Sequence, residues 1–370
     1  MMRLLISGGG TGGHIYPALA LARYALSVDK DTAVLFVGTE RGMESKIVPQ
    51  AGFRLETIPA MGFQRQLKQL IPVLAVFKAG LARARKIIRE FKPDVVLGTG
   101  GYVSAPVVLA AVLARLPAVI HEQNALPGLA NRLLAPLVSR VCLSFAETGR
   151  RFSFLSKTVV TGNPRASEVA AASREEGLKA LGLHPDRRTI LAYGGSRGAL
   201  QINKVMVNYI RECGLPTRSQ LLYITGDIYY EQVMDELGLI PEGVKVLPYL
   251  NNMPAALAAA DLLITRSGAT TLAEITALGI PALLIPSPNV VNNHQYYNAR
   301  LLADRGAALL INEPDFNHLR LHREIERLWS EPERLARMAR ASKKMGIPDA
   351  AARLYDCLVA VQKKQARGGN

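Results

Sequence analysis

Short apolar runs alternate with longer amphipathic segments along the whole chain, and this alternation limits the fold more than any other feature of the sequence. The runs expected to be strands lie at residues 4–7, 33–37, 95–97, 118–121, 141–143 and 158–160, and again at 189–193, 220–225, 244–246, 262–265 and 282–285. Strands that are apolar on both faces, with helical segments between them, are typical of parallel sheets covered on both sides. We therefore predict an α/β chain with two doubly wound parallel sheets.

The two halves of the chain begin alike, which predicts two domains of the same plan. Residues 3–14 read RLLISGGGTGGH and residues 189–199 read TILAYGGSRGA, so each half starts with a strand, a glycine loop and a helix. A chain of 370 residues is also too long for one ordinary core. We expect an N-terminal domain at 1–162, a C-terminal domain at 163–345, and a helix within 346–370 that packs back across the junction before a frayed basic tail.

The charge of the chain is strongly positive and unevenly distributed. The net charge is +15, of which residues 1–162 carry +11, with 20 basic and 9 acidic residues. Such an excess indicates an anionic partner, such as phosphate, nucleic acid or anionic lipid. The three cysteines form no CxxC motif, so we expect neither a disulfide framework nor a zinc site, and a reducing cytoplasm suits them. The longest apolar run, 107–114, is far below the roughly 20 residues that span a bilayer.

The first glycine loop, residues 8–13, formally matches the dinucleotide-binding pattern GxGxxG after a strand and before a helix. A nicotinamide oxidoreductase would also need an acidic residue to hold the ribose, and Glu40 is the candidate. However, His14 follows the glycines directly, where a dinucleotide-binding loop normally has no titratable group. The loop alone leaves open whether it binds a dinucleotide.

Polar residues gather after several other predicted strands. The second glycine loop, 194–198, suits a diphosphate or is a tight turn. Glu274, in the early turns of the helix after residue 268, could hold a ribose diol or act only on the helix dipole. The residues His294 and Gln295 suit sugar hydroxyls and equally suit a solvated loop. Because ligands of open α/β sheets bind beyond the carboxyl ends of the strands, these loops are candidate sites.

The segment from residue 62 to residue 92 combines apolar residues at near-helical spacing with many cations. Its apolar positions include Leu67, Leu70, Ile71, Leu74 and Phe77, and its cations include Lys68 and Lys78. The segment is either core with a solvated basic face or a patch that docks on anionic lipid. Pro72 is expected to interrupt the helix. Nucleic-acid binding is disfavoured, because aromatic interleaving and any recognised module are missing.

Taken in order, the motifs resemble those of the MurG family of bacterial glycosyltransferases, over about residues 3–360. The motifs lie at residues 8–17, 98–103, 121–124, 162–164, 194–196, 266–269 with Glu274, and 294–295. These enzymes transfer N-acetylglucosamine from UDP-N-acetylglucosamine to the undecaprenyl-linked muramyl pentapeptide, lipid I, and form lipid II. The resemblance implies a GT-B fold, in which two Rossmann-like domains face a central cleft, and no metal or other cofactor.

The resemblance also implies roles for individual residues. Ser196 would meet the diphosphate, the Leu250 backbone the uracil, and Glu274 the ribose. The donor-binding set is Thr11, Gly12, Gly13, Asn124, Arg165, Ser196, Leu250, Ala269, Thr270, Thr271, Leu272, Ala273, Glu274 and Gln295. The chain departs from the family pattern Gly-Asn-Pro-x-Arg, since Arg165 follows Pro164 directly and Ala166 takes the expected place; His294 likewise stands where some relatives have Gln.

The family implies inversion by single displacement, with a general base that takes the proton of the acceptor C4 hydroxyl. His14 is the first candidate, because an imidazole pKa of about 6.5 suits this role near neutrality, and Glu122 is the second. Tyr102 and His121 are expected on the acceptor side. A lipid-linked acceptor gives the segment 62–92 a purpose in peripheral docking on the cytoplasmic face of the plasma membrane.

The expected partners are UDP-N-acetylglucosamine, lipid I, anionic inner-leaflet lipid and other cell-wall synthesis proteins, with no nucleic acid. Two hypotheses from other classes stay open at this stage: a nicotinamide oxidoreductase and a non-enzymatic basic adaptor. Within the same fold, a lipid galactosyltransferase or a UDP-sugar 2-epimerase is the nearest alternative.

Overall fold

The computed structural model of the chain describes residues 2–62, 70–195 and 198–368. The chain divides into two compact units, one made of Met1–Ser167 with Asp349–Asn370 and the other of Glu168–Pro348. The chain passes from one unit to the other after Ser167 and again after Pro348, in each case a few residues beyond the boundary expected from the sequence. Arg165 and the C-terminal helix therefore belong to the N-terminal unit.

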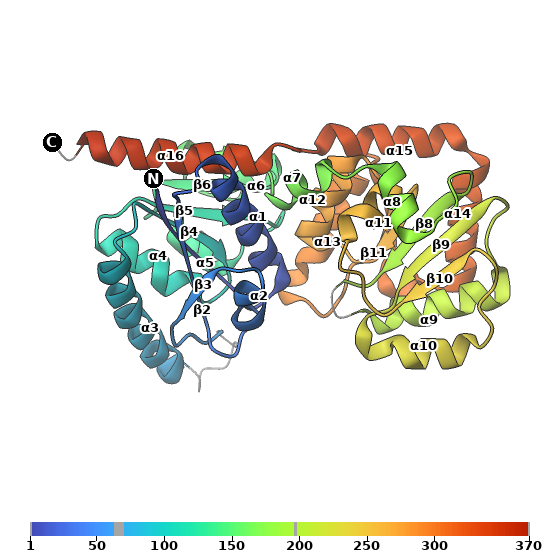
Figure 1. Cartoon of the computed structure of the whole chain (residues 1–370), viewed down its shortest axis with the longest axis horizontal. Helices are drawn as coiled ribbons and strands as arrows, with labels where there is room; N and C mark the ends of the chain where they lie inside the picture. The colour runs from blue at the N-terminus through green and yellow to red at the C-terminus, as the bar shows by residue number, and fades with distance from the viewer. Residues whose placement is uncertain (1, 63–69, 196–197, 369–370) are drawn as a thin grey trace. The chain divides into compact units, whose positions relative to one another are not determined.

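The N-terminal unit is built on a seven-stranded parallel sheet with the order β3-β2-β1-β4-β5-β6-β7 (Figure 1). The strands are β1 (Arg3–Gly8), β2 (Ala33–Gly38), β3 (Arg54–Thr57), β4 (Val95–Gly100), β5 (Ala118–Glu122), β6 (Arg140–Leu143) and β7 (Thr158–Val160). Leu4, Leu5 and Ile6 of β1 have no exposed surface, as expected of a strand buried on both faces. Strand β3 was not predicted, because its sequence RLET lacks an apolar run.

Helices cover both faces of this sheet. They are α1 (Gly12–Val28), α2 (Glu44–Gln50), α3 (Leu70–Phe91), α4 (Ser104–Leu113), α5 (Leu129–Leu134), α6 (Ala146–Gly149) and α16 (Ala350–Gly368), with a 3₁₀ turn η2 (Leu155–Lys157). The short helix α7 (Arg165–Ala170) contains the boundary between the two units. Leu5 faces the cluster formed with α3, α4 and α5, whereas Leu4 and Ile6 face the cluster formed with α1, α2 and α16. The period-two alternation of side chains along a strand explains this division.

The prediction that Pro72 interrupts a helix is wrong. Among the described residues α3 starts at Leu70, which puts Pro72 within the first turn of the described helix. A first-turn residue needs no helical partner for its backbone N–H, and proline, which has none, is tolerated there.

The C-terminal unit repeats the plan with a six-stranded parallel sheet of order β10-β9-β8-β11-β12-β13. Its strands are β8 (Arg188–Tyr193), β9 (Ser219–Ile224), β10 (Val244–Leu247), β11 (Leu262–Thr265), β12 (Ala282–Leu284) and β13 (Ala308–Leu310). Its helices are α8 (Arg174–Leu181), α9 (Leu200–Asn208), α10 (Tyr230–Leu237), α11 (Met253–Ala259), α12 (Ala269–Leu278), α13 (His294–Ala303), α14 (His318–Ser330) and α15 (Pro332–Met345), with short turns η3 (Tyr209–Cys213), η4 (Asp227–Tyr229), η5 (Val291–Asn293) and η6 (Glu313–Asp315). Two doubly wound parallel sheets are thus confirmed.

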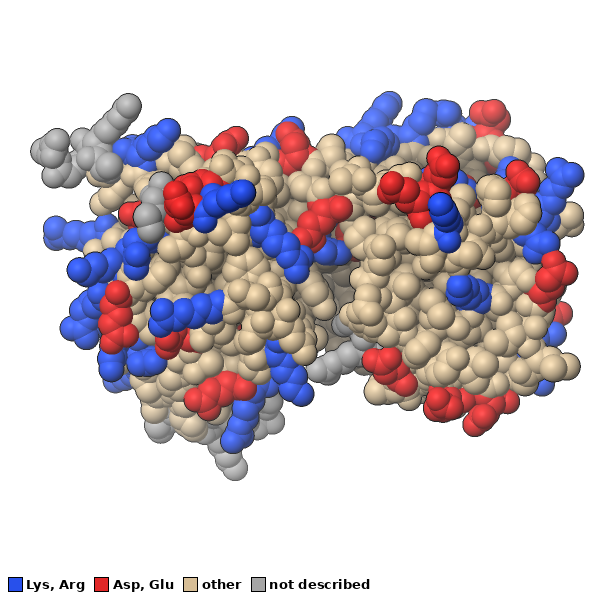
Figure 2. Space-filling view, in the orientation of Figure 1, with Lys and Arg blue, Asp and Glu red and all other residues tan. Residues whose placement is uncertain are grey.

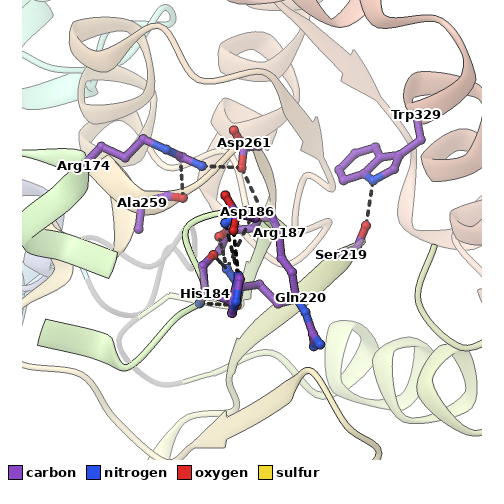
Figure 3. A network of polar contacts seen from close by, with 10 residues as sticks. Arg174, His184, Asp186, Arg187, Ser219, Gln220, Ala259, Asp261 and Trp329 are labelled. Carbon is purple, nitrogen blue, oxygen red and sulfur yellow. Dashed lines mark hydrogen bonds and ion pairs between the residues drawn. The ribbon is translucent and has the colours of Figure 1, made fainter. Parts of the chain in front are cut away.

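A polar network ties the amino ends of the strands of this second sheet to the helices around them (Figure 3). Asp261 accepts hydrogen bonds from the backbone of Thr189 and from Arg174, both at 2.8 Å. The Trp329 indole donates to the Ser219 hydroxyl at 2.7 Å. The network lies at the amino ends of the strands, opposite the glycine loop. We therefore assign it a role in the stability of the unit rather than in ligand binding.

In each sheet the strand order reverses beside the first strand of the unit. β1 lies between β2 and β4, and β8 lies between β9 and β11. Open α/β sheets bind ligands at the carboxyl ends of the strands that flank such a switch point. Both predicted glycine loops, after β1 and after β8, lie at these points.

Candidate active site

In the N-terminal unit, the loop after β1 presses against the loop after β4. A Cβ atom on Gly101, whose φ is +80°, would lie 2.5 Å from the carbonyl oxygen of Gly9. A Cβ on Gly8 would lie 1.9 Å from Thr99 Oγ1, and the Thr99 hydroxyl donates to the carbonyl of His14 at 2.9 Å. The glycines here are required for the close approach of the two loops.

His14 lies in the first turn of α1 and is half-buried. Its Nδ1 is 2.9 Å from the carbonyl oxygen of Gly9 and 3.2 Å from Thr11 Oγ1. Because a carbonyl only accepts, Nδ1 carries the proton in this arrangement and Nε2 of the neutral ring keeps its lone pair. A Cβ atom on Gly100 would lie 3.1 Å from His14 Nε2. Glycine at position 100 therefore leaves room for the imidazole ring of His14.

The sequence analysis did not select Glu44, whose carboxylate accepts a hydrogen bond from the first glycine loop. It is fully buried at the start of α2, and its Oε2 accepts from the Gly10 N–H at 3.0 Å. Its Oε1 accepts from the backbone N–H and the hydroxyl of Thr39, at 3.0 and 2.7 Å. An acidic residue after the second strand was the sequence signal that could have identified Glu44. The dinucleotide-binding pattern pointed instead to Glu40, which is exposed.

The position of Glu44 bears on the dinucleotide hypothesis. A dinucleotide-binding loop turns its backbone N–H groups toward a pyrophosphate. Here a carboxylate already takes the N–H of Gly10. A carboxylate at this place disfavours a phosphate on the same loop, and the nicotinamide oxidoreductase loses its main support.

Glu122 ties the loop between β5 and α5 together. Its Oε1 accepts from the backbone and side-chain amides of Asn124, at 3.0 and 3.2 Å. Its Oε2 accepts from the Gly128 N–H at 2.9 Å and from Asn131 Nδ2 at 2.8 Å. The side chain is buried, so these four bonds favour a loop-holding role for Glu122 over the base role predicted for it.

His121 is completely buried and joins the end of β5 to the segment before α7. Its Nε2 donates to the Gly162 carbonyl at 2.9 Å, and its Nδ1 accepts from Gln123 Nε2 at 3.0 Å. Burial lowers the pKa of His121 to about 4, opposed by the bond to Gly162 and aided by the nearby His14. The His121 imidazole is therefore neutral near pH 7, and it is buried against the loop after β5 and the segment before α7.

The other predicted residues of the N-terminal unit lie in the first glycine loop, in the loops after β4 and β5, and at the start of α7. Thr11 is exposed, while Gly12, Gly13 and Asn124 are half-buried. Tyr102 is 38% exposed, and its ring would lie 3.3 Å from a Cβ on Gly10. The Arg165 guanidinium lies 5.8 Å from the centre of the Tyr16 ring, which itself borders Gly12. Tyr102 thus borders the first glycine loop, and Arg165 lies beside the first turns of α1.

In the C-terminal unit, the predicted donor residues lie around the amino end of α12. Gly268 caps the helix, and the first-turn backbone N–H groups of residues 269–271 point outward from its end. The side chains of Ala269, Leu272, Ala273 and Glu274 are buried, whereas Thr270 and Thr271 are half-buried. Leu272 and Ala273 belong to the packed interior, so only their backbone could serve a ligand.

Gln295 is fastened to the loops after β11 and β12. Its side-chain oxygen accepts from the Ser287 N–H at 2.9 Å, and its carbonyl accepts from the Ser267 hydroxyl at 2.8 Å. The neighbouring His294 bonds the Val291 carbonyl through Nδ1 at 2.9 Å. Leu250 is half-buried in the loop after β10, and Ser196 lies outside the described residues.

The predicted lipid-docking segment corresponds to α3, on the left in Figure 2, where Lys and Arg gather. Leu74 is 51% exposed, Lys78 is exposed and Phe77 is half-buried. Leu70 and Ile71 open the helix, and Leu67 and Lys68 lie outside the described residues. The sequence analysis missed further exposed leucines on or beside the neighbouring helices α4 and α5, namely Leu113, Leu129, Leu133 and Leu137.

The described part of the chain contains neither a membrane-spanning helix nor a metal-binding cluster. None of its helices is long and apolar enough to cross a membrane. None of its groups of His, Cys, Asp or Glu side chains has three members placed to hold a metal ion.

The chain matches both domains of one enzyme class. The N-terminal domain of glycosyltransferase family 28 matches residues 4–143, and the C-terminal domain of the same family matches residues 189–354. Among solved structures, Acinetobacter baumannii MurG is 28% identical, with a TM-score of 0.78 over 97% of this chain and all of that one. A UDP-GlcNAc 2-epimerase from Neisseria meningitidis, at 15% identity and a TM-score of 0.68, shares the fold alone.

Curated relatives narrow the class further. A protein of Halalkalibacterium halodurans named UDP-N-acetylglucosamine–N-acetylmuramyl-(pentapeptide) pyrophosphoryl-undecaprenol N-acetylglucosamine transferase is 47% identical and covers 98% of this chain and 100% of its own length. The Acetivibrio thermocellus protein of the same name is 43% identical over 99% of this chain and 100% of its own length. The chain belongs to the MurG family of glycosyltransferases.

Proposed function

We propose that this protein transfers N-acetylglucosamine from UDP-N-acetylglucosamine to undecaprenyl-pyrophosphoryl-N-acetylmuramyl pentapeptide, so that lipid I becomes lipid II. The observation that carries the proposal is the placement of His14 in a chain of this family: its ring is held through Nδ1 at the switch point of the N-terminal sheet. Relatives with 43–47% identity bear the name of this activity over their full length.

The reaction needs a base at the acceptor hydroxyl. In the proposed step, the C4 hydroxyl oxygen of the muramyl sugar attacks the anomeric carbon, the bond to UDP breaks, and the configuration inverts. His14 Nε2 takes the hydroxyl proton. The Gly9 carbonyl, 2.9 Å from Nδ1, holds the tautomer that leaves Nε2 basic and accepts from the imidazolium that forms.

The leaving diphosphate needs stabilisation of its growing charge. We assign this task to backbone N–H groups at the start of α12 and in the second glycine loop with Ser196, because helix amino ends favour anions without a metal. Glu274 binds the ribose, the Leu250 backbone the uracil, and residues 269–271 with Gln295 the sugar.

The remaining N-terminal residues complete the proposed site. Thr11, Gly12, Gly13 and Asn124 approach the donor sugar and the acceptor, and Tyr102 lies on the acceptor side. Glu122 and His121 act as positioning residues, since both side chains are buried and fully engaged with neighbouring loops.

A lipid-linked acceptor requires access to a membrane surface. Helices α3, α4 and α5 pack side by side and display exposed leucines with cations such as Lys78 and Arg132 nearby. Leucine side chains would enter the headgroup boundary while cations meet anionic lipid. We propose peripheral docking of this surface on the cytoplasmic face of the plasma membrane.

The donor assignment is tested by calorimetric titration with UDP-N-acetylglucosamine, UDP-galactose and NADH without added divalent metal. Selective binding of UDP-N-acetylglucosamine supports the proposal, whereas binding of NADH alone or of none of the three overturns it. Conversion of lipid I to lipid II in detergent, followed by chromatography, then tests the acceptor. Release of N-acetylmannosamine products from the donor alone would indicate an epimerase instead.

A further inference from the structure

Two of the three cysteines meet inside the N-terminal unit, although 215 residues separate them in sequence. Their sulfur atoms are 3.5 Å apart. Cys142 lies in β6 without exposed surface, and Cys357 lies in α16 and is half-buried. The pair lies on the sheet face covered by α1, α2 and α16, and it takes no part in the site described above.

We propose that Cys142 and Cys357 form a reversible disulfide when the protein meets a hydroperoxide, and that this bond fastens the C-terminal helix to the sheet. The inference is independent of the proposed transferase activity.

The surroundings hold the two thiols face to face. Leu354 and Leu358, buried against the sheet, flank Cys357 on the inner side of α16. Tyr355 of the same helix packs edge-on against Tyr24 of α1, with ring centres 5.8 Å apart. A disulfide has an S–S distance of about 2.05 Å, so the sulfurs must approach by about 1.5 Å. The proposed bond therefore requires a small shift of α16 over the sheet.

The two thiols differ in reactivity. The hydrogen bond from Cys142 and the charge of Arg140 lower the pKa of Cys357. Cys357 is half-buried whereas Cys142 has no exposed surface, so we expect a peroxide to meet Cys357 first. The hydrogen bond to Cys357 and burial raise the pKa of Cys142. Since the thiolate is the nucleophile, Cys357 reacts first and Cys142 resolves the product.

The chemistry balances with one hydroperoxide. The Cys357 thiolate attacks the terminal peroxide oxygen, the O–O bond breaks, and the departing alkoxide or hydroxide takes a proton, which leaves a sulfenic acid. The Cys142 sulfur then attacks the Cys357 sulfur, the S–O bond breaks, and hydroxide leaves with the proton of Cys142 as water. Two thiols are oxidised to one disulfide, and the peroxide is reduced to an alcohol, or water, and water.

The bond would close a loop that contains the whole C-terminal unit, because residues 168–348 lie between the two cysteines. A cross-link across so long a loop restricts the unfolded chain more than the folded one. We therefore expect the oxidised protein to unfold at a higher temperature than the reduced protein, and expect protease to cleave its C-terminal helix more slowly.

The test treats the purified full chain with hydrogen peroxide and counts free thiols under denaturing conditions. The expected count falls from three to one, the mass falls by two hydrogens, and a peptide map links Cys142 to Cys357. Dithiothreitol restores all three thiols. Persistence of three thiols, oxidation of Cys357 to sulfinic acid without a cross-link, or a link that involves Cys213 would each overturn the proposal.

Variants separate this bond from general oxidation. Cys213→Ser should form the same cross-link and show the same rise in unfolding temperature, because Cys213 lies in the C-terminal unit. Cys357→Ser should show neither the cross-link nor the rise, and its half-buried site on a helix makes it the safer variant if Cys142→Ala fails to fold. An equal rise in Cys357→Ser would contradict the mechanism.

Discussion

Replacing Glu44 with Gln tests whether a buried carboxylate holds the loop that carries the proposed base. The carboxylate accepts three hydrogen bonds, from the Gly10 N–H and from two groups of Thr39. In Glu44→Gln one acceptor oxygen becomes an NH₂ group, which must face another donor. A hydrogen bond to a charged group contributes about 1.5–3 kcal/mol, and an unmatched buried donor costs a similar amount, so we expect about 2–4 kcal/mol of lost stability.

The same change should reach the chemistry. Gly10 adjoins Gly9, whose carbonyl oxygen holds Nδ1 of His14. A reacting group displaced by about 1 Å can lose about 100-fold in rate. We therefore expect kcat to fall by about 10- to 100-fold, while the KM for UDP-N-acetylglucosamine, assigned mainly to the C-terminal unit, changes little.

The matched control is Glu40→Gln, the same chemical change four residues away at an exposed position. Thermal unfolding and steady-state conversion of lipid I would be measured for both variants. If Glu44→Gln unfolded and turned over like Glu40→Gln, the argument that Glu44 positions the loop would be refuted.

Four further predictions concern the other parts of the molecule. His14→Gln should lower kcat by about 10²- to 10⁴-fold and leave calorimetric binding of UDP-N-acetylglucosamine unchanged; near-normal turnover would remove His14 as the base. Glu274→Gln should raise the donor KM by about tenfold or more, through loss of a charged hydrogen bond to the ribose, and an unaltered KM contradicts that role. Leu74→Glu with Phe77→Glu should weaken sedimentation with anionic liposomes, whereas Leu239→Glu, at a 94% exposed site of the C-terminal unit, should not; equal binding by both removes α3 from the docking surface. Because His121 has a folded pKa of about 4, below the unfolded value of about 6.5, its contribution to stability is complete above pH 6.5 and is lost as the pH falls to 4, by about 3 kcal/mol; urea unfolding across this range should be less pH-dependent in His121→Gln.

Local patterns in the sequence carried much of the fold and part of the candidate site. The apolar runs that predicted β1, β4, β5 and most other strands are local, because a strand covered on both faces needs an apolar side chain at every position. Strand β3 and the described start of α3 show the limit, since RLET has no apolar run and Pro72 taken alone fits either a helix break or a residue of the first helical turn. The motif order alone indicated the family.

What the sequence by itself determined is the strands other than β3 and β13, the two glycine loops and the residue types that follow each predicted strand. Only the tertiary structure decided which of these residues meet, because contacts depend on the order of strands in the sheet. The adjacency of β1 and β4 places Gly100 against His14, and the packing of α2 selects Glu44 rather than Glu40 beneath the loop. For the same physical reason, Cys142 and Cys357 are 215 positions apart in the chain, yet their sulfur atoms are 3.5 Å apart in the structure.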